Sequence, residues 1–330
     1  MRSFLALALA GAVSATTMHQ NDYKFMRWIV EHNKEYSTIE EFNMRKSNFL
    51  FMDAEIARLN QEINATSVHG HNHLSDMTRQ EYQALLGLKN MPLPDRTGRP
   101  IMETSNLVGL PTSVNWVTAG KVNAIKNQGS CGSCWSFSAN ASTESAHAIF
   151  YSTLPNLSEQ QLVSCSGSFG NQGCNGGWYY YAWDYNVKTP LASETTYPYT
   201  SGNFGVTGTC KYVAGSGTIY NQSQTDVAGN TTAIMTAIAQ QVVSVAIQAD
   251  TTTFQSYKSG VITSSACGTN IDHAVAAVGY GTDPSAGGYY LVRNSWGTSW
   301  GDQGYVKIGQ ASGAGICGIN QYVAYPTVKA

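Results

Sequence analysis

The sequence has no excess of charge of either sign. Its 330 residues include 19 Lys and Arg against 21 Asp and Glu, so the formal net charge is −2. This balance gives no reason to expect nucleic acid or an anionic membrane surface as a partner. Charged residues are few, at 12%, whereas 42% of the residues are hydrophobic and 11% are aromatic. These proportions are typical of a packed globular protein rather than a disordered chain.

Long apolar runs are also missing. The run from Phe4 to Val13 is too short for a bilayer, which requires about 20 helical residues. Because Arg2 precedes this run and small residues follow it as far as Ala15, residues 1–15 are predicted to be a cleaved secretory signal. A buried N-terminal helix is the alternative. No later stretch is apolar and long enough to span a membrane, so we expect a soluble mature protein that enters an oxidising compartment.

Cysteine is absent from the part of the chain that precedes Cys131. Seven cysteines lie between Cys131 and Cys317, and an odd number in a secreted chain implies an intermolecular bridge or a free thiol. Charge is uneven too, since residues 1–109 contain 23 of the Lys, Arg, Asp and Glu residues and the longer stretch 110–330 contains only 17. The sequence therefore predicts two segments of different character, joined near residue 109.

The first segment is predicted to be mainly helical. Apolar residues recur at helical spacing in NDYKFMRWIVEHNKEY (21–36) and IEEFNMRKSNFLFMDAEIARLNQEI (39–63), which indicates a helical hairpin. HGHNHLSDMTRQEY (69–82) is interpreted as a strand and turn, and KNMPLPDRTGRP (89–100) as an accessible linker. Three alternating histidines resemble a metal-binding pattern, but without Cys or further His nearby a metal site is disfavoured. They are His69, His71 and His73.

A nucleophile candidate opens the clearest helix of the second segment. NQGSCGSCWSFS (127–138) places Cys131 and Cys134 three positions apart, and SCWSFSANASTESAHAIFY (133–151) predicts a helix with Ser133 as N-cap. The partial positive charge of a helix N-terminus favours thiolate, so a lowered pKa is predicted for Cys134. A thiol redox pair of Cys131 and Cys134 is the alternative, and it is disfavoured because no βαβ pattern follows.

A cysteine nucleophile needs a base, and only two histidines follow residue 110. His147 lies 13 residues farther along the helix of Cys134, hence about 20 Å away, which excludes it. His273 remains, with a partly buried strand histidine as the alternative interpretation. It opens one of four β-branched or aromatic runs that predict an antiparallel sheet or barrel. These runs are VVSVAIQAD (242–250), DHAVAAVGYG (272–281), GGYYLVRNSWG (287–297) and GYVKIGQ (304–310).

Residues 110–330 resemble a papain-family cysteine protease of the cathepsin L type. The resemblance rests on CGSCW around Cys134, on His273 far downstream of it, and on the NSWG motif that contains Asn294. It implies an α+β, papain-like two-lobed fold: a helical left lobe, an antiparallel β-barrel-like right lobe and an active-site cleft between them. The implied roles are nucleophile for Cys134, general acid and base for His273, orienting amide for Asn294 and oxyanion donor for Gln128.

The same resemblance implies a cysteine endopeptidase that acts through a thioacyl-enzyme on Cys134. The stretch between Cys174 and Cys210 contains no insertion with paired histidines, so nothing in the sequence suggests an exopeptidase. The pocket for the second residue before the cut (P2) is expected to have an apolar lining, and the large side chain of Tyr322 is expected to shorten it. An apolar lining predicts a hydrophobic P2 side chain rather than Arg. The two tryptophans of NSWGTSWG are expected to cover the contact between Asn and His and to line the leaving-group side. The implied substrate-binding residues are Gly176, Gly177, Trp178, Ala246, Ile271, Ala274, Trp296, Trp300 and Tyr322.

The first segment resembles the inhibitory propeptide of the family. Its helical pattern between residues 41 and 60 matches, with Met52 where the family usually has Asn, and GHNHLSD matches with Leu74 in place of Phe. The predicted division is a signal peptide (1–15), an inhibitory, mainly helical propeptide (16–109) and a papain-like peptidase domain (110–330). The mature N-terminus is expected between Leu107 and Pro111. By resemblance the disulfides join Cys131 to Cys174, Cys165 to Cys210, and Cys267 to Cys317, which leaves Cys134 free.

The implied partners are peptide and protein substrates, the chain's own propeptide as intramolecular inhibitor, and cystatin-like inhibitors. No cofactor or metal is implied, and a monomer is expected. The destination is the lysosome, a digestive vacuole or the extracellular space. A catalytically inactive papain-like binding protein is the alternative, disfavoured because the catalytic residues are all present.

Two further expectations concern processing. Acid is predicted to loosen the propeptide by protonating its carboxylates and charging His69, His71 and His73. Sequons permit glycosylation at several sites, whereas the sequon at Asn140 lies on the helix of the nucleophile and is expected to be unused. The permitted sites are Asn64, Asn156, Asn221 and Asn230.

Overall fold

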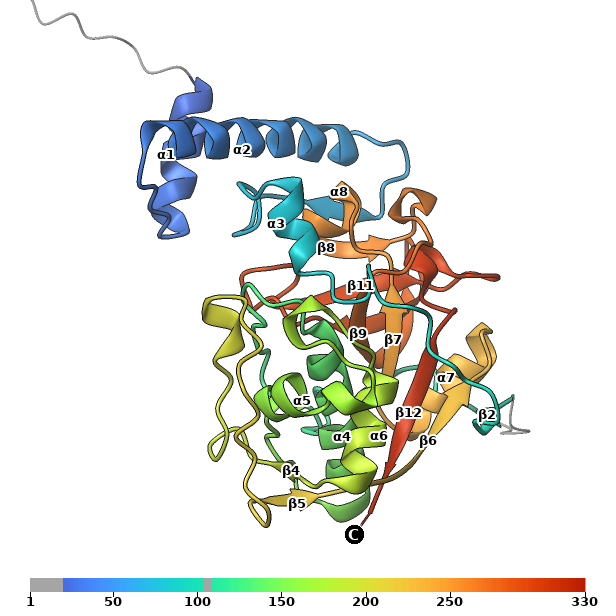
Figure 1. Cartoon of the computed structure of the whole chain (residues 1–330). Helices are drawn as coiled ribbons and strands as arrows, with labels where there is room; N and C mark the ends of the chain where they lie inside the picture. The colour runs from blue at the N-terminus through green and yellow to red at the C-terminus, as the bar shows by residue number, and fades with distance from the viewer. Residues whose placement is uncertain (1–19, 104–108, 330) are drawn as a thin grey trace, which may run out of the picture.

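Two crossed helices at the N-terminal end lie above a two-lobed body in the computed structural model, which describes residues 20–103 and 109–329 (Figure 1). The signal peptide predicted at 1–15 lies outside the described residues, as do residues 104–108 near the predicted cleavage site. Among the described residues, no helix is both long and apolar enough to cross a membrane.

The helical hairpin predicted for the first segment is confirmed. It consists of α1 (Gln20–Glu31) and α2 (Ile39–Asn60), which pack through buried aromatic side chains. The rings of Phe25 and Trp28 in α1 lie 5.2 and 5.3 Å from the ring of Phe49 in α2. Because short helices are marginal in water, burial of this aromatic seam is the main stabilising term of the hairpin.

The segment after the hairpin attaches it to the body. β1 (Ser67–His69) pairs antiparallel with β8 (Tyr257–Ile262), and α3 (Arg79–Ala84) follows. This helix corrects the expected turn, and its sequence signal is a capping box. Thr78 Oγ1 accepts from the backbone N–H of Glu81, and the Glu81 carboxylate accepts from the N–H of Thr78.

Residues 89–100 contain neither helix nor strand, as predicted, but they are not a free linker. Met91 and Pro94 are buried against the body. The segment leads into β2 (Ile101–Met102), which pairs in parallel with β6 (Asn221–Val227) of the body. The predicted accessibility therefore holds only for the exposed side chains between these attachment points.

The left lobe is built around α4 (Cys134–Tyr151), as predicted from residues 133–151. This helix is buried on nearly every face, because α5 (Glu159–Cys165) and α6 (Tyr179–Lys188) pack beside it and the sheet of the other lobe lies behind it (Figure 1). Two short strands complete the lobe. They are β4 (Leu191–Ala192) and β5 (Gly217–Ile219).

The right lobe is a mainly antiparallel sheet. The four runs predicted as strands each form one, whereas β6 and β8 were missed because their sequences, NQSQTDV and YKSGVI, are largely polar or interrupted by Gly. The remaining elements are β3 (Val114–Asn115), α7 (Thr231–Gln240), β7 (Val243–Ile247), α8 (Thr252–Gln255), β9 (His273–Asp283), β10 (Gly287–Arg293), β11 (Tyr305–Gly309) and β12 (Val323–Val328).

Strands of the first segment form both ends of this sheet. The order is β1-β8-β11-β10-β9-β7-β12-β6-β2, with β3 paired to β9. Two pairings, β8 with β11 and β2 with β6, are parallel and the others are antiparallel. The first segment is therefore hydrogen-bonded to the second at both edges.

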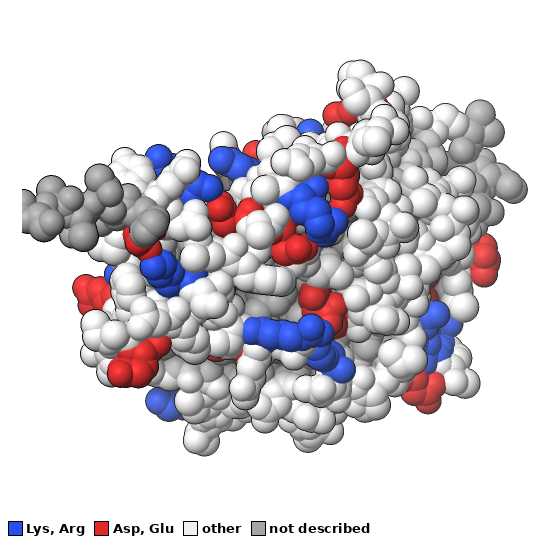
Figure 2. All heavy atoms as spheres, turned by 90° about the horizontal axis from the view of Figure 1, so that it is seen from above, with Lys and Arg blue, Asp and Glu red and all other residues white. Residues whose placement is uncertain are grey.

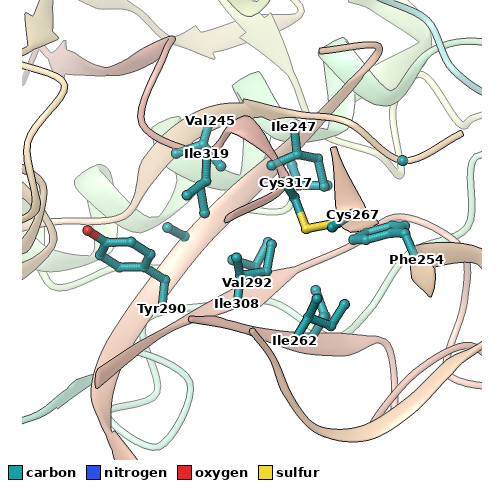
Figure 3. Close-up of a cluster of buried hydrophobic side chains, with 14 of the residues drawn as sticks. Val245, Ile247, Phe254, Ile262, Cys267, Tyr290, Val292, Ile308, Cys317 and Ile319 are labelled. Atoms are coloured by element: carbon teal, nitrogen blue, oxygen red, sulfur yellow. A yellow bond between two sulfur atoms is a disulfide. The ribbon is translucent and has the colours of Figure 1, made fainter. Parts of the chain in front are cut away.

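The core of the right lobe consists of buried side chains from the strands and from the segments that connect them. Val245, Ile247 and Val292 meet Ile308 around the disulfide Cys267–Cys317 (Figure 3). The other two disulfides, Cys131–Cys174 and Cys165–Cys210, lie in the left lobe. These are the three pairs that the resemblance implies.

Charged side chains on the upper face are mixed in sign. Figure 2 shows basic and acidic groups side by side over the N-terminal helices and large uncharged areas elsewhere. Several of these groups are ion pairs, such as Lys24 with Asp53 at 2.8 Å. Such a face offers no uniformly basic surface for a polyanion.

Candidate active site

The free thiol of the chain lies at the first residue of α4. Cys134 is fully buried and is the cysteine left outside the three disulfides. Ser133 occupies the N-cap position, but its hydroxyl bonds the Tyr199 hydroxyl at 2.7 Å instead of capping the helix, which corrects its predicted role. Because Cys131 is joined to Cys174, a redox pair between Cys131 and Cys134 is excluded.

The backbone of the other lobe contacts this sulfur one residue after a histidine. His273 is the first residue of β9, and the backbone N–H of the next residue, Ala274, donates to Cys134 Sγ at 3.5 Å. The Nε2 atom of His273 hydrogen-bonds Asn294 Oδ1 at 2.8 Å, while Nδ1 is buried without a hydrogen-bond partner. His147 is bonded to Thr153 at the far end of α4 and takes no part.

Two tryptophans and a phenylalanine form the wall behind His273. Trp296 stacks on the imidazole with ring centres 4.7 Å apart, and Trp300 packs against Trp296 at 5.2 Å. Both indoles are buried in the full chain, and the Nε1 of Trp300 donates to the carbonyl of Gln255. Phe254 of α8 packs on both indoles, a contact with no signal in the sequence.

The side-chain amide of Gln128 is fixed by its surroundings. Its Oε1 accepts from Ser295 Oγ at 2.7 Å and from Trp296 Nε1 at 3.1 Å. This leaves the NH₂ group pointing towards the sulfur-bearing loop, where it donates to the carbonyl oxygens of Cys131 and Leu85, both at 2.8 Å. The Leu85 carbonyl belongs to the N-terminal segment, and it accepts from the NH₂ group that was predicted to bind the oxyanion.

The N-terminal segment covers the sulfur with Gly87. A Cβ atom on this glycine would lie 2.1 Å from the Gly132 carbonyl oxygen and 3.1 Å from Cys134 Sγ, so no larger residue fits. The peptide group between Gly87 and Leu88 bridges both lobes. Its carbonyl accepts from Gly177 N–H at 3.0 Å and its N–H donates to the Asp272 carbonyl at 2.9 Å.

The predicted P2 residues are brought together beyond this peptide group. Leu88 and Met91 pack among them, and Trp178 Nε1 donates to the Pro92 carbonyl at 2.8 Å. The ring of Tyr322 lies 5.3 Å from that of Trp178. The cluster comprises Trp178, Ala246 and Ala274, with the partly buried Ile271 and Tyr322 at its margin, and Gly176 and Gly177 border it.

Burial under the N-terminal segment keeps the sulfur and the imidazole uncharged. It raises the pKa of the Cys134 thiol to about 11 and lowers the pKa of His273 to about 4. The lowered thiol pKa predicted from the helix N-terminus is thus wrong for the full chain. Desolvation outweighs the N–H donors of Ala274 and Gly87 that favour the thiolate.

The three alternating histidines do not form a metal site. His69 bonds Ser256 Oγ at 3.1 Å and His73 bonds Ser299 Oγ at 2.9 Å, so both face the peptidase part. His71 points the other way, to Asp53 at 3.1 Å. In the described part of the chain, no three His, Cys, Asp or Glu side chains are placed to hold a metal ion.

Two family models match the chain. The model described as papain family cysteine protease matches residues 110–327, and the cathepsin propeptide inhibitor domain (I29) matches residues 25–82. Among named proteins, cysteine proteinase COT44 of Brassica napus is 40% identical over 92% of this chain and 95% of its own length. Germination-specific cysteine protease 1 of Arabidopsis thaliana is 38% identical over 92% of this chain and 83% of its own.

Solved structures of precursors are similar over nearly the whole chain. A recombinant stem bromelain precursor has a TM-score of 0.82 at 32% identity, covering 94% of this chain and 99% of its own. Digestive procathepsin L 3 of Tenebrio molitor larval midgut has a TM-score of 0.83 at 30% identity, with the same coverage. The α+β papain-like fold is thereby confirmed, and the chain belongs to the papain family of cysteine proteases, with a cathepsin-type inhibitory propeptide ahead of the peptidase domain.

Proposed function

We propose that this cysteine protease precursor hydrolyses internal peptide bonds through Cys134, with His273 as its acid and base. The observation that carries the proposal is the position of the one free sulfur next to the start of β9, where the N–H of Ala274 donates to it and the preceding residue, His273, is hydrogen-bonded to Asn294. A thiol at the start of a helix next to an oriented imidazole is the arrangement that nucleophilic acyl transfer requires.

The reaction follows once water and substrate replace the propeptide. His273 takes the thiol proton, the thiolate of Cys134 attacks the scissile carbonyl, and the imidazolium gives its proton to the leaving amine. Water, activated by the same imidazole, then releases the acyl group from sulfur. Asn294 accepts from Nε2 and so leaves Nδ1, which has no other hydrogen-bond partner, as the nitrogen proposed to exchange the proton with the sulfur.

The oxyanion formed on attack is proposed to bind the side-chain amide of Gln128 and the backbone N–H of Cys134. Gln128 suits this role because Ser295 and Trp296 hold its oxygen and so fix the direction of its NH₂ group. Loss of one such donor typically lowers kcat by about 10²-fold to 10³-fold.

The bound propeptide runs against the direction proposed for a substrate. Its earlier residues lie on the leaving-group side, where the ring of Tyr82 packs 5.6 Å from that of Trp296. Its later residues, Leu88 and Met91, lie on the P2 side. What covers Cys134 is Gly87, with its carbonyl paired to Gly177, so no scissile carbonyl is presented to the sulfur. This explains how the segment fills the site without being cut.

Labelling of the thiol at two pH values tests this function. An epoxide electrophile is expected to modify Cys134 alone, slowly in the full chain at pH 7 and at least about tenfold faster at pH 4.5. A parallel sample without the electrophile is expected to cleave its propeptide at pH 4.5. Peptide mapping by mass spectrometry identifies the modified residue. Modification at another cysteine, or equal rates of labelling and processing at both pH values, would contradict the proposal.

The pH dependence follows from histidines that are neutral when buried. Burial lowers the pKa of His73 to about 4 and shifts the pKa values of His69 and His71 in the same direction. The ordinary value is about 6.5, so the released form takes up protons that the docked form does not. Docking of the propeptide is therefore fully stable above about pH 6.5 and weakens as the pH falls towards 4.

Two carboxyl groups also affect how docking of the propeptide depends on pH. The Arg45 guanidinium holds the pKa of Glu81 at about 2, so this ion pair loses its contribution only below the ordinary carboxyl range. Burial raises the pKa of Asp272 to about 7, which opposes release because the docked form keeps this proton. The two histidines that face the peptidase part, His69 and His73, together with His273 outnumber this single opposing group.

The P2 preference is proposed to be hydrophobic. The described pocket residues are Ala246, Ala274, Ile271 and the ring of Tyr322, and the propeptide fills the same place with Leu88 and Met91. In kcat/KM measurements, peptides with Leu or Phe at P2 are expected to exceed the matched Arg peptide by at least about tenfold, because an apolar wall cannot solvate a guanidinium. Fastest cleavage of the Arg peptide would refute this preference.

Domain limits and destination are proposed on the same basis. The signal (1–15), propeptide (16–109) and peptidase domain (110–330) remain as predicted, and three disulfides favour the secretory pathway, with lysosome, digestive vacuole or extracellular space as endpoint. Protein substrates and cystatin-like inhibitors are the proposed partners of a monomer.

Glycosylation is proposed only at exposed sequons. Asn221 lies in β6 with its side chain buried against Thr143, so this site is removed from the predicted set. Asn140 is fully buried, in line with its expected lack of use. The exposed sequons are Asn64, Asn156 and Asn230.

A further inference from the structure

Removal of the propeptide uncovers both edges of the sheet, at β8 and at β6. β2 is the outermost strand beside β6, and the backbone N–H groups of Asp226 and Ala228 donate to the carbonyl oxygens of Pro100 and Met102 at 2.9 and 3.0 Å. Once β2 leaves, β6 becomes the edge and these donors lose their partners. An edge strand with free backbone groups is a template for another extended peptide.

A buried carboxylate lies on this edge. The side chain of Asp226 is only 2% exposed, and neither of its oxygens has a hydrogen-bond partner. The nearest cation is Arg96 of the propeptide, whose Nε lies 3.5 Å from Asp226 Oδ2. After release, the carboxylate faces the space that this guanidinium occupied, with the hydroxyl of Tyr180 as its remaining neighbour.

Two propeptide arginines lie in this region in the same manner. Arg96 stacks over the ring of Tyr322 at 4.9 Å while facing Asp226. Arg99 stacks over the ring of Tyr180 at 4.9 Å, and its Nη2 lies 3.4 Å from Asp184 Oδ2. Each guanidinium is thus placed between an aromatic face and a carboxylate, a combination that suits the planar charge of arginine better than the ammonium of lysine.

These two positions continue the P2 side of the active site. Met91 packs in the P2 cluster, and Arg96 follows it by five residues, close enough for an extended chain at about 3.3 Å per residue. Tyr322 belongs to both places, because its side chain packs against the P2 cluster and the Arg96 guanidinium stacks over its ring. The flank of a substrate that precedes the cut would leave the site over this surface.

We propose that the released enzyme has an arginine-binding surface, formed by Asp226 and Asp184 with the rings of Tyr322 and Tyr180, for the flank of an extended substrate upstream of the cut. The inference rests on the proposed function, since it assumes that the propeptide leaves and that substrates enter from this side. The chemical class is a peptide with guanidinium side chains, and the propeptide arginines mark where those groups bind.

Paired peptides test the surface on the acid-activated enzyme. One core sequence with Leu at P2 is extended upstream, and a single Arg is scanned over roughly four to eight residues before the cut, each time against citrulline, its uncharged isostere. At one or two positions, kcat/KM is expected to be about three- to tenfold higher for Arg, mainly through KM, and the difference should shrink with added salt.

Asparagine variants connect this preference to the two carboxylates. In Asp226→Asn and Asp184→Asn the Arg preference is expected to fall, and in the double variant to disappear, whereas Asp283→Asn in the β9–β10 turn should retain it. Asp184 is partly exposed, so its variant keeps the test decisive if the Asp226 variant folds poorly.

The short core peptide separates failure of this inference from failure of the proposed function. Its turnover should be equal in all variants. Equal cleavage of Arg and citrulline peptides, or an Arg preference that survives in the double variant, overturns the arginine-binding surface while short-peptide hydrolysis still supports Cys134 catalysis. Absence of any hydrolysis in the activated wild-type enzyme would instead refute the proposed function.

Discussion

Replacing Cys134 with alanine is expected to abolish peptide hydrolysis, with kcat/KM reduced by at least about 10⁴-fold. The sulfur is the only free thiol among the seven cysteines, and it accepts from the N–H of the residue that follows His273. The remaining donors could still bind a peptide, but no covalent step is available to them. The same variant should also remain a full-length precursor in acid, because self-processing needs the same thiol.

The two histidines of the peptidase part provide the matched control. His273→Ala should lose activity to a similar degree, since the thiolate then lacks its proton acceptor. His147→Ala should retain it, because His147 bonds only Thr153 and lies at the other end of α4. Thermal unfolding of each precursor checks folding. Hydrolysis that persists in Cys134→Ala, or that is lost equally in His147→Ala, would show that the nucleophile lies elsewhere.

Replacing Gly87 with alanine is expected to release the active site at neutral pH. A methyl group at this position would lie 2.1 Å from the Gly132 carbonyl, a backbone atom that cannot rotate away. The propeptide must shift, and the hydrogen bonds to Gly177 and Asp272 are lost with it. Two bonds at about 1 kcal/mol each, plus overpacking of about 1 kcal/mol or more, correspond to at least about a hundredfold weaker docking.

The rate of epoxide labelling of Cys134 at pH 7 in the full chain measures this change. We expect a rise of about a hundredfold in Gly87→Ala relative to wild type. Gly167→Ala is the control, since a Cβ there meets no atom within 4 Å and its labelling rate should not change. A wild-type rate in Gly87→Ala, with the precursor folded, would mean that this glycine does not determine access to the sulfur.

Much of the fold followed from local signals in the sequence. Helical spacing predicted α1, α2 and α4, and β-branched runs predicted β7, β9, β10 and β11. The missed α3 had a usable signal in Thr78 and Glu81, because a capping box is a local pattern. β6 had none: NQSQTDV forms a strand because β12 and β2 supply its hydrogen-bond partners, and those partners lie far away in the chain.

The sequence by itself determined which atoms are available for chemistry: one odd cysteine at a helix start, one histidine outside that helix within residues 110–330, and motifs that connect both to a known family. These are short-range features of residue type and spacing. Only the tertiary structure decided where these groups lie, what covers them and whether they are charged. It brought His273 from a distant part of the chain to Cys134, placed Gly87 over the sulfur and buried both groups so that they are uncharged. It also paired Arg96 with Asp226. Desolvation and long-range pairing depend on what the folded chain places around a group, and no local pattern specifies that environment.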